Sequence, residues 1–363
     1  MVNQEFDFVN SFINNVSFPQ TLEQFISVID DKGCYDIQIL MFEAEEENGW
    51  VCWTSPRNCV IGDVVLFFHA KSAIKKIKRL ENIVKKLDPN EYNIDYLLDW
   101  LDDAKELYSM YGAKIFAMGR ISSRPEREDD EYFDKYWGSR IYAKVEDLHI
   151  LDNPIDFEEF NSFIYLARQS AITPLPSKEF ELLKEIIHSK NPDVPKWFLN
   201  SKIGDYQLSK VNKDNFIELT SGYRKRFPLE VSFRSYYVDY FLKALARNKV
   251  YKECICCSEE HPLARVDNIF EYNGKKILLE VKLNIDLEKD LISQLNQYIG
   301  AEYVYLGDYK TENKITDFEK DYMFVIDVYA VYKYSGGKLV KMFDLDEIKC
   351  VEDIVGRMGG GID

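Results

Sequence analysis

The sequence predicts a mixed α/β protein with two or three domains. Its 363 residues exceed the usual length of a single domain. Short apolar runs such as GDVVLFFHA (62–70) are typical of strands, whereas Ser72–Tyr111 carries the apolar spacing of helices. Near the C-terminus, the turn sequence Asn273-Gly274 joins two apolar runs and predicts a β-hairpin. Strand-rich and helix-rich stretches therefore alternate along the chain.

Composition excludes several classes of protein. A hydrophobic content of 46% indicates a folded chain rather than a disordered one. No apolar run reaches the ~18 residues of a membrane span, and the N-terminus MVNQEFDFVN lacks a signal-peptide pattern. The seven cysteines are an odd number and do not read as a disulfide framework. We therefore expect a cytoplasmic protein that does not associate with membranes.

The elements are expected in the following order. Residues 1–34 read as a helical segment. Strands are expected at DIQILMFEAE (36–45), GWVCW (49–53) and GDVVLFFHA, followed by a helical insertion at 72–111 that is broken at Asp88-Pro89-Asn90. Strands resume at AKIFAMGRISS (113–123) and SRIYAKVEDLHI (139–150), and helices dominate 157–208.

The hairpin at Asn273-Gly274 places charged residues opposite one another. A two-residue loop fixes the register, and the opposed pairs are then Glu271 with Lys276, Ile269 with Leu278, and Asp267 with Glu280. Like charges directly opposite each other destabilise a sheet, so two opposed carboxylates suggest a bound divalent cation. Lys282 projects from the same face as Glu280. Two acids and a lysine at one point are the set needed for metal-assisted hydrolysis of a phosphodiester.

This pattern resembles a known superfamily of nucleases. Asp267 with Glu280-Val281-Lys282 resembles the D…ExK signature of the PD-(D/E)XK superfamily, although Val266 stands where proline is common. The resemblance implies a mixed sheet flanked by helices. It also implies Mg²⁺ or Mn²⁺ held by Asp267, Glu280 and the Val281 carbonyl, with Lys282 orienting the attacking water.

Two helices complete the resemblance. Gln294-Leu295-Asn296-Gln297-Tyr298 matches the Q-h-x-x-Y motif of the exonuclease-like branch, which adds Gln294 and Tyr298 to the implied catalytic set. The superfamily also implies an acid on the helix before the hairpin, here Val231–Ala246. Asp239 has the expected spacing to the apolar residues that follow it. Glu230 at the helix start is the rival, although an acid there can serve only the helix dipole.

A second resemblance covers residues 35–183. TSPRNCVIGDVVLFFHAKS (54–72) resembles the PUA-like barrel of EVE domains, and Ile115–Ser122 and Thr173–Phe180 resemble later segments of that family. Such barrels imply recognition of a nucleobase flipped out of a duplex, which needs aromatic walls and a few polar groups. The candidate pocket residues are Trp53, Ser55, Asn58, Phe68 and His69. Alternation along the strand puts Val64, Leu66 and Phe68 on one face and Val65, Phe67 and His69 on the other, so one of these faces must be core.

Basic and cysteine clusters leave further alternatives open. The net charge of −16 argues against indiscriminate adhesion to nucleic acid. Arg224, Lys225 and Arg226 precede the nuclease helix and could contact a phosphate backbone, or could be an ordinary solvated charge run. Cys254 and Cys257 have ligand-like spacing, with His261 nearby, but buried sulfur in a strand is the simpler interpretation.

Together these observations predict a multidomain α+β or α/β protein. The expected parts are a helical segment (1–34), a PUA/EVE-like base- or nucleotide-sensing barrel (35–183, with the insertion 72–111), a helical linker (184–222), a PD-(D/E)XK nuclease domain with a restriction-endonuclease-like sheet (223–350) and a tail (351–363). The expected function is that of a type IV-like restriction endonuclease, which cuts modified double-stranded DNA with Mg²⁺ or Mn²⁺ as a homodimer. The alternatives are an antiviral DNase or RNase triggered by a small nucleotide and a non-catalytic nucleic-acid-binding protein.

Overall fold

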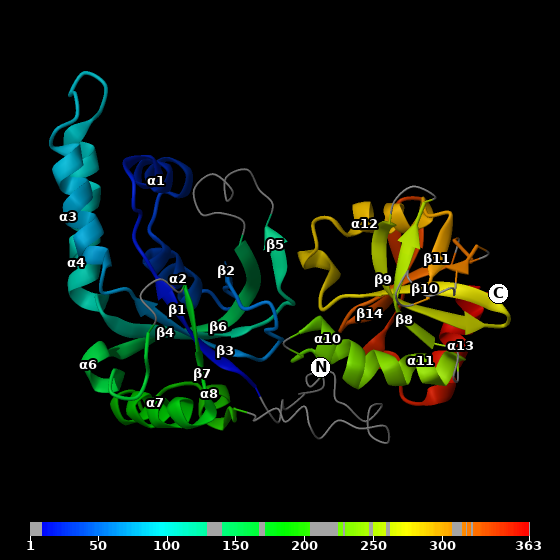
Figure 1. Ribbon diagram of the computed structural model, residues 1–363. Helices are drawn as coiled ribbons and strands as arrows, with labels where there is room; N and C mark the ends of the chain where they lie inside the picture. Colours follow the sequence, from blue (N-terminus) through cyan, green and yellow to red (C-terminus); the bar gives the residue numbers. More distant parts are fainter. Residues whose placement is uncertain are drawn as a thin grey trace. The chain divides into compact units, whose positions relative to one another are not determined.

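The computed structural model forms two compact units, residues 1–205 and 206–363, and is mixed α/β throughout (Figure 1). The residues that it describes are 9–128, 140–166, 171–203, 224–227, 229–246, 250–258, 262–306, 314–316, 318–320 and 322–362. No helix within these ranges is both long and apolar enough to cross a membrane.

The first unit is built on a mixed sheet. Its strands are β1 (Ser11–Val16), β2 (Val51–Thr54), β3 (Val64–His69), β4 (Lys114–Ile121), β5 (Glu126–Glu128), β6 (Arg140–Asp156) and β7 (Ile172–Leu175). Their order is β2-β6-β4-β3-β1-β7, with β5 on β6, and only β1 and β3 run parallel. The sheet curls into half a barrel. Among the described strands, no pairing between β2 and β7 closes it.

Helices cover both faces of this sheet. One cluster of buried residues joins it to α1 (Leu22–Ser27), the π-helical turn η1 (Val28–Lys32), α2 (Asp36–Glu45), α3 (Ala73–Val84) and α4 (Ile94–Tyr111). A second cluster joins it to α6 (Phe157–Phe160), α7 (Ser177–Lys190) and α8 (Lys196–Asn200). The predicted insertion is confirmed as the hairpin of α3 and α4. The predicted alternation in β3 is also confirmed, and both of its faces are core, since all six of its residues are buried.

Three predictions for the first unit were wrong. Residues 36–45 form the helix α2 instead of a strand, because Ile37 and Leu40 are buried at helical spacing and the Gln38 side chain accepts from the Tyr35 amide at 2.8 Å. The segment 1–34 is not wholly helical, because β1 lies inside the sheet. Within the expected linker, α7 and α8 bury Ile187 and Phe198 in the core of this unit.

The second unit contains a sheet of eight strands. They are β8 (Val250–Cys257), β9 (Pro262–Tyr272), β10 (Lys275–Val281), β11 (Tyr303–Tyr305), β12 (Lys314–Ile315), β13 (Met323–Ile326), β14 (Ala330–Ser335) and β15 (Lys338–Asp344). Their order is β12-β11-β8-β9-β10-β13-β14-β15, and only β10 and β13 are parallel. Short 3₁₀ turns, η4 (Ile285–Leu287) and η5 (Leu345–Glu347), follow β10 and β15.

The helices of the second unit also lie on both faces of the sheet. One face packs against α10 (Glu230–Phe233), the π-helical turn η3 (Arg234–Val238), α11 (Asp239–Ala246) and α13 (Val351–Ile362). The other face packs against α12 (Leu291–Ile299). The expected tail is therefore wrong, because α13 buries Ile354, Met358 and Ile362 in the core. Its Gly359 allows close packing, since a Cβ there would lie 2.6 Å from the Tyr272 hydroxyl.

Candidate active site

The hairpin of β9 and β10 has the predicted register. Asn273 and Gly274 adopt φ angles of 49° and 80°, as a tight turn of this kind requires. The pairs Glu271–Lys276 and Ile269–Leu278 are confirmed. The ladder stops after Asn268–Leu279, where the Asp267 side chain takes over: its Oδ2 accepts from the Val281 amide at 2.9 Å. Asp267 is therefore fixed against the strand that carries Glu280.

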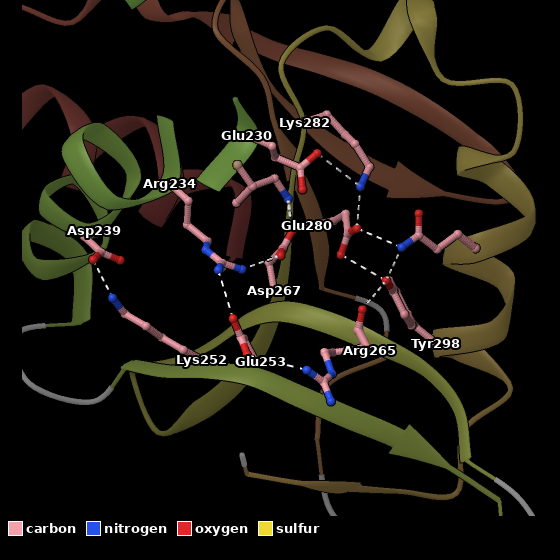
Figure 2. Close-up of polar contacts among 12 residues, drawn as sticks. Glu230, Arg234, Asp239, Lys252, Glu253, Arg265, Asp267, Glu280, Lys282 and Tyr298 are labelled. Atoms are coloured by element: carbon pink, nitrogen blue, oxygen red, sulfur yellow. Dashed lines mark hydrogen bonds and ion pairs between the residues drawn. The ribbon is translucent and has the colours of Figure 1, made fainter. Parts of the chain in front are cut away.

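Glu280 is the centre of a buried hydrogen-bond network. It is 2% exposed, and its Oε1 accepts from Lys282 Nζ at 2.7 Å and from Gln294 Nε2 at 2.8 Å. The Tyr298 hydroxyl lies 3.0 Å from Oε2 and 2.8 Å from the Arg265 carbonyl oxygen. Figure 2 shows Lys282 and Tyr298 on two sides of the Glu280 carboxylate. The structure thus brings together the hairpin and helix residues that the sequence motifs singled out.

The Lys282 ammonium feels the charges of three carboxylates, those of Glu280, Glu230 and Asp267. Burial, with the Asp267 carboxylate as a second cause, raises the pKa of Glu280 to about 7. Burial, the largest single influence, would lower the pKa of Lys282, but the charge and hydrogen bond of Glu280 together with the charges of Glu230 and Asp267 outweigh it, and the pKa is raised. Lys282 therefore carries its positive charge at neutral pH, whereas burial and the Asp267 charge oppose the ionisation of Glu280.

Of the two candidate helix acids, Glu230 is the one that lies beside Lys282. Glu230 Oε2 lies 3.6 Å from Lys282 Nζ, and burial and nearby carboxylates raise the pKa of Glu230. Asp239 instead pairs with Lys252 of β8, away from Glu280 (Figure 2). Asp239 therefore lies outside the Glu280 network, contrary to the sequence-based preference. The π-helical turn η3 lies between the two acids and changes their relative direction, which sequence spacing does not reveal.

Two residues at the site were not anticipated. Arg234 Nη1 donates to Asp267 Oδ1 at 2.7 Å, and its Nη2 donates to Glu253 Oε1 at 3.1 Å (Figure 2). The one sequence signal for Arg234 was its position four residues after Glu230, where helical neighbours share a face. Glu253 carried no comparable signal.

The donor chemistry of this cluster fits a hard divalent cation. Asp267 and Glu280 supply carboxylate oxygens, which Mg²⁺ and Mn²⁺ prefer, and their mutual repulsion is what a cation would relieve. The Val281 amide donates to Asp267 Oδ2, so the backbone of the third implied ligand adjoins Asp267. In the described ranges, no group of three or more Cys, His, Asp or Glu side chains is arranged to hold a metal. The candidate set is consistent with this finding, because it has only two side-chain ligands.

The basic triplet does not form a phosphate-binding surface. Arg224 and Arg226 are 2% and 5% exposed. Arg224 Nε donates to the Val328 carbonyl at 2.7 Å, and its guanidinium pairs with Asp346. Lys225 Nζ donates to the same carboxylate at 3.0 Å. The prediction of nucleic-acid contacts was therefore wrong for Arg224 and Arg226, which are buried, and the charges of Arg224 and Lys225 tie this segment to η5.

The five candidate pocket residues do not line one pocket. Phe68 packs against Phe157 and Phe160 on one face of the sheet, whereas Trp53 packs edge-on against Phe67 on the other. A shared pocket that includes Phe68 is thus contradicted, because both faces are core.

The polar members of that set are mostly buried. Ser55 and His69 are 4% and 3% exposed, and Asn58 is half-buried. His69 faces a small cavity that is also lined by Tyr35 and Asp36. Its Nδ1 has no hydrogen-bond partner among the described residues, and burial lowers its pKa to about 4. His69 is therefore a neutral interior histidine.

The cysteines of β8 are buried in the strand. Cys254 and Cys256 belong to the core beneath α12, and burial raises the pKa of Cys256 to about 12. Cys257 pairs with Tyr303 of β11 as part of the sheet. His261, the histidine near these cysteines that was considered as a metal ligand, lies outside the described residues.

Comparison with known proteins adds no relative to this picture. No model of a known protein family matches the sequence, and no curated protein matches it.

Proposed function

We propose that the second unit is a metal-dependent phosphodiesterase of the PD-(D/E)XK type that cuts DNA. The single observation that carries this proposal is the Glu280 network. A carboxylate that is 2% exposed contacts Lys282, Gln294 and Tyr298 and lies beside Asp267. Burying this many charges is costly, and perturbed acids with specific partners cluster at functional sites.

Each residue of the site would have a distinct role in phosphodiester hydrolysis. Asp267, Glu280 and the Val281 carbonyl would hold Mg²⁺ or Mn²⁺, which lowers the pKa of a bound water and neutralises phosphate charge. Lys282, kept protonated by Glu280 and Glu230, orients the attacking water and stabilises charge that develops on the phosphate. Gln294 and Tyr298 fix the Glu280 carboxylate, since both contact it from one face of α12.

We further propose that the first unit recognises the substrate, namely double-stranded DNA with a modified base. The chain forms two compact units, which supports a division of base recognition and DNA cleavage between them. Trp53 and Asn58 are the pocket candidates that retain exposed surface. Cutting both strands needs two active sites, so a homodimer would form at least during cleavage. The acidic net charge of −16 would keep affinity for unrelated DNA low.

The test is cleavage of two plasmids, one unmodified and one carrying modified phage-type bases, with Mg²⁺ or Mn²⁺. The wild-type protein should cut, and Asp267→Ala and Lys282→Ala should abolish cutting while DNA binding persists. Lys276→Ala, which removes a lysine from the same hairpin away from Glu280, is the matched control. Undiminished cutting by both site variants would refute the assignment of the active site.

The same assay separates the remaining functions. Selective cutting of the modified plasmid supports base recognition, and loss of that selectivity in Trp53→Ala would place the reader at β2. Cutting of both plasmids, or of RNA, after addition of a small nucleotide would favour the triggered effector nuclease. Metal binding without any cleavage would favour a non-catalytic nucleic-acid-binding protein.

A further inference from the structure

Asp267 lies in a row of three carboxylates that crosses the sheet. The β8–β9 pairs Lys252–Asn268 and Cys254–Val266 place Glu253 opposite Asp267. On its other side, Asp267 adjoins Glu280 at the end of the β9–β10 ladder. Opposed like charges destabilise a sheet, so the row needs compensating cations.

The Arg234 guanidinium offsets the negative charge of two carboxylates of this row, Asp267 and Glu253. It joins Asp267 Oδ1 at 2.7 Å to Glu253 Oε1 at 3.1 Å (Figure 2). Oδ1 is the Asp267 oxygen that the Val281 amide leaves open, because that amide binds Oδ2. Arg234 therefore occupies the Asp267 oxygen that would otherwise be available to a divalent cation.

Glu253 is held in an unusual conformation at this point. Its φ angle of 51° lies in the left-handed region, which non-glycine residues rarely adopt inside a strand. Backbone strain of this kind persists where the surrounding structure imposes it and is concentrated at functional sites. The Glu253 side chain is half exposed and also lies 3.5 Å from Arg265 Nη1. It can thus serve as a second position for the Arg234 guanidinium without being buried.

We propose that Arg234 is an internal competitor of the divalent cation: it binds Asp267 in the metal-free protein and shifts onto Glu253 when the cation binds. This inference rests on the proposed function, because it takes Asp267 as a metal ligand. It adds a regulatory role for two residues outside the motif. Without the cation, Arg234 keeps the largely buried Asp267 carboxylate paired. When the cation binds, Glu253 remains a partner of Arg234 and lowers the free-energy cost of releasing Arg234 from Asp267.

The test is isothermal titration of the full-length protein with Mn²⁺ in the absence of DNA, so that no activity is needed. Arg234→Gln should bind Mn²⁺ about fivefold more tightly than wild type, which is the equilibrium effect of removing an ion pair worth about 1 kcal/mol. Glu253→Gln should act in the opposite direction, because Arg234 then has only Asp267 as a partner. Two variants that merely loosen the structure would both weaken binding.

A double variant and a charge control sharpen the experiment. If Glu253 acts only through Arg234, the pair Arg234→Gln and Glu253→Gln together should match Arg234→Gln alone. Lys252→Gln removes an equal charge next to Glu253, but its partner is Asp239, so binding should stay within about twofold of wild type. Circular dichroism of each variant checks that the second unit is folded.

The outcomes separate the inference from the proposed function. Unchanged or weaker binding in Arg234→Gln, with wild-type binding that Asp267→Asn removes, would overturn the role of Arg234 and leave the metal site intact. Absence of Mn²⁺ binding in wild type and in Arg234→Gln would overturn both. Tighter binding in Arg234→Gln and weaker binding in Glu253→Gln would establish the competition.

Discussion

The strands β3 and β10 are both central, and each carries one buried polar residue near its C-terminal end, but the surroundings of the two residues differ. In β3 the polar residue is His69, whose Nδ1 has no hydrogen-bond partner in the described part of the protein. In β10 it is Glu280, whose two oxygens accept three hydrogen bonds. Desolvation acts on both groups, and it moves each pKa in the direction that favours the neutral form.

The difference lies in what surrounds the buried group. Around Glu280, a cation, an amide and a hydroxyl stabilise the ionised carboxylate, and a network of this kind is maintained at a considerable desolvation cost. Around His69, the neighbours are mostly apolar, and its ring packs edge-on against Tyr108 at 5.4 Å. Burial of a polar residue therefore does not indicate function by itself. The presence of several specific partners is the better indicator.

The largest expected effect is on chemistry at β10. Glu280→Gln should reduce metal-dependent cleavage by a factor on the order of 10³ or more, because it removes a ligand charge while keeping the side-chain volume. Single-turnover plasmid cleavage at saturating Mg²⁺ measures this effect. Glu271→Gln, the same substitution on the same hairpin, should cut normally. Similar rates for both variants would remove the functional distinction between β10 and β3.

The next effect is on the stability of β3. Phe68→Ala should lower the free energy of unfolding of the first unit by about 3–5 kcal/mol, because it empties a fully enclosed core position. All five tryptophans lie in residues 1–205, so tryptophan fluorescence during urea unfolding reports on this unit alone. A loss below about 1 kcal/mol would mean that Phe68 is not a core residue.

A smaller effect concerns the pH dependence of the first unit. The pKa of His69 is lowered from 6.5 to about 4, so the unfolded state takes up the proton first as the pH falls. The contribution of neutral His69 to the free energy of unfolding is therefore fully present above about pH 6.5. It is lost toward pH 4, by about 2–3 kcal/mol between pH 7 and 4.5. His69→Gln should flatten this dependence in tryptophan-monitored urea unfolding. An equally steep loss in the variant would assign the acid sensitivity to other groups.

The smallest effect distinguishes the two acids near the helix start. Glu230→Gln should slow cleavage by about 10- to 100-fold, as is usual for groups that orient a metal-site residue from outside, because Glu230 contacts Lys282. Asp239→Asn, matched in charge and volume change, should leave the rate nearly unchanged, because its partner is Lys252. The reverse order of effects would restore Asp239 as the functional acid.

The sequence could predict features that depend on local rules. The Asn273-Gly274 turn fixed the hairpin register through its need for positive φ angles, and the spacing of Gln294 and Tyr298 placed both on one face of α12. Apolar spacing likewise predicted the helices α3 and α4 and the alternation in β3. Each of these depends on residues that are close together in the chain.

What the tertiary structure decided concerns partners that are far apart in sequence. The pairing of Arg224 with Asp346 turned an apparent basic surface into a buried contact. Residues 351–363 were expected to be a tail, yet Lys275 and Lys333 donate to the carbonyls of Ile362 and Gly361 at 2.9 and 3.0 Å and hold the end of α13. With the π-helical turn η3 between the two acids, Glu230 rather than Asp239 lies beside Lys282, and Arg234 donates to Asp267. Sequence alone determined which chemical groups the hairpin presents. Long-range packing decided which charges lie next to them, because desolvation and ion pairing depend on neighbours that are distant in the chain.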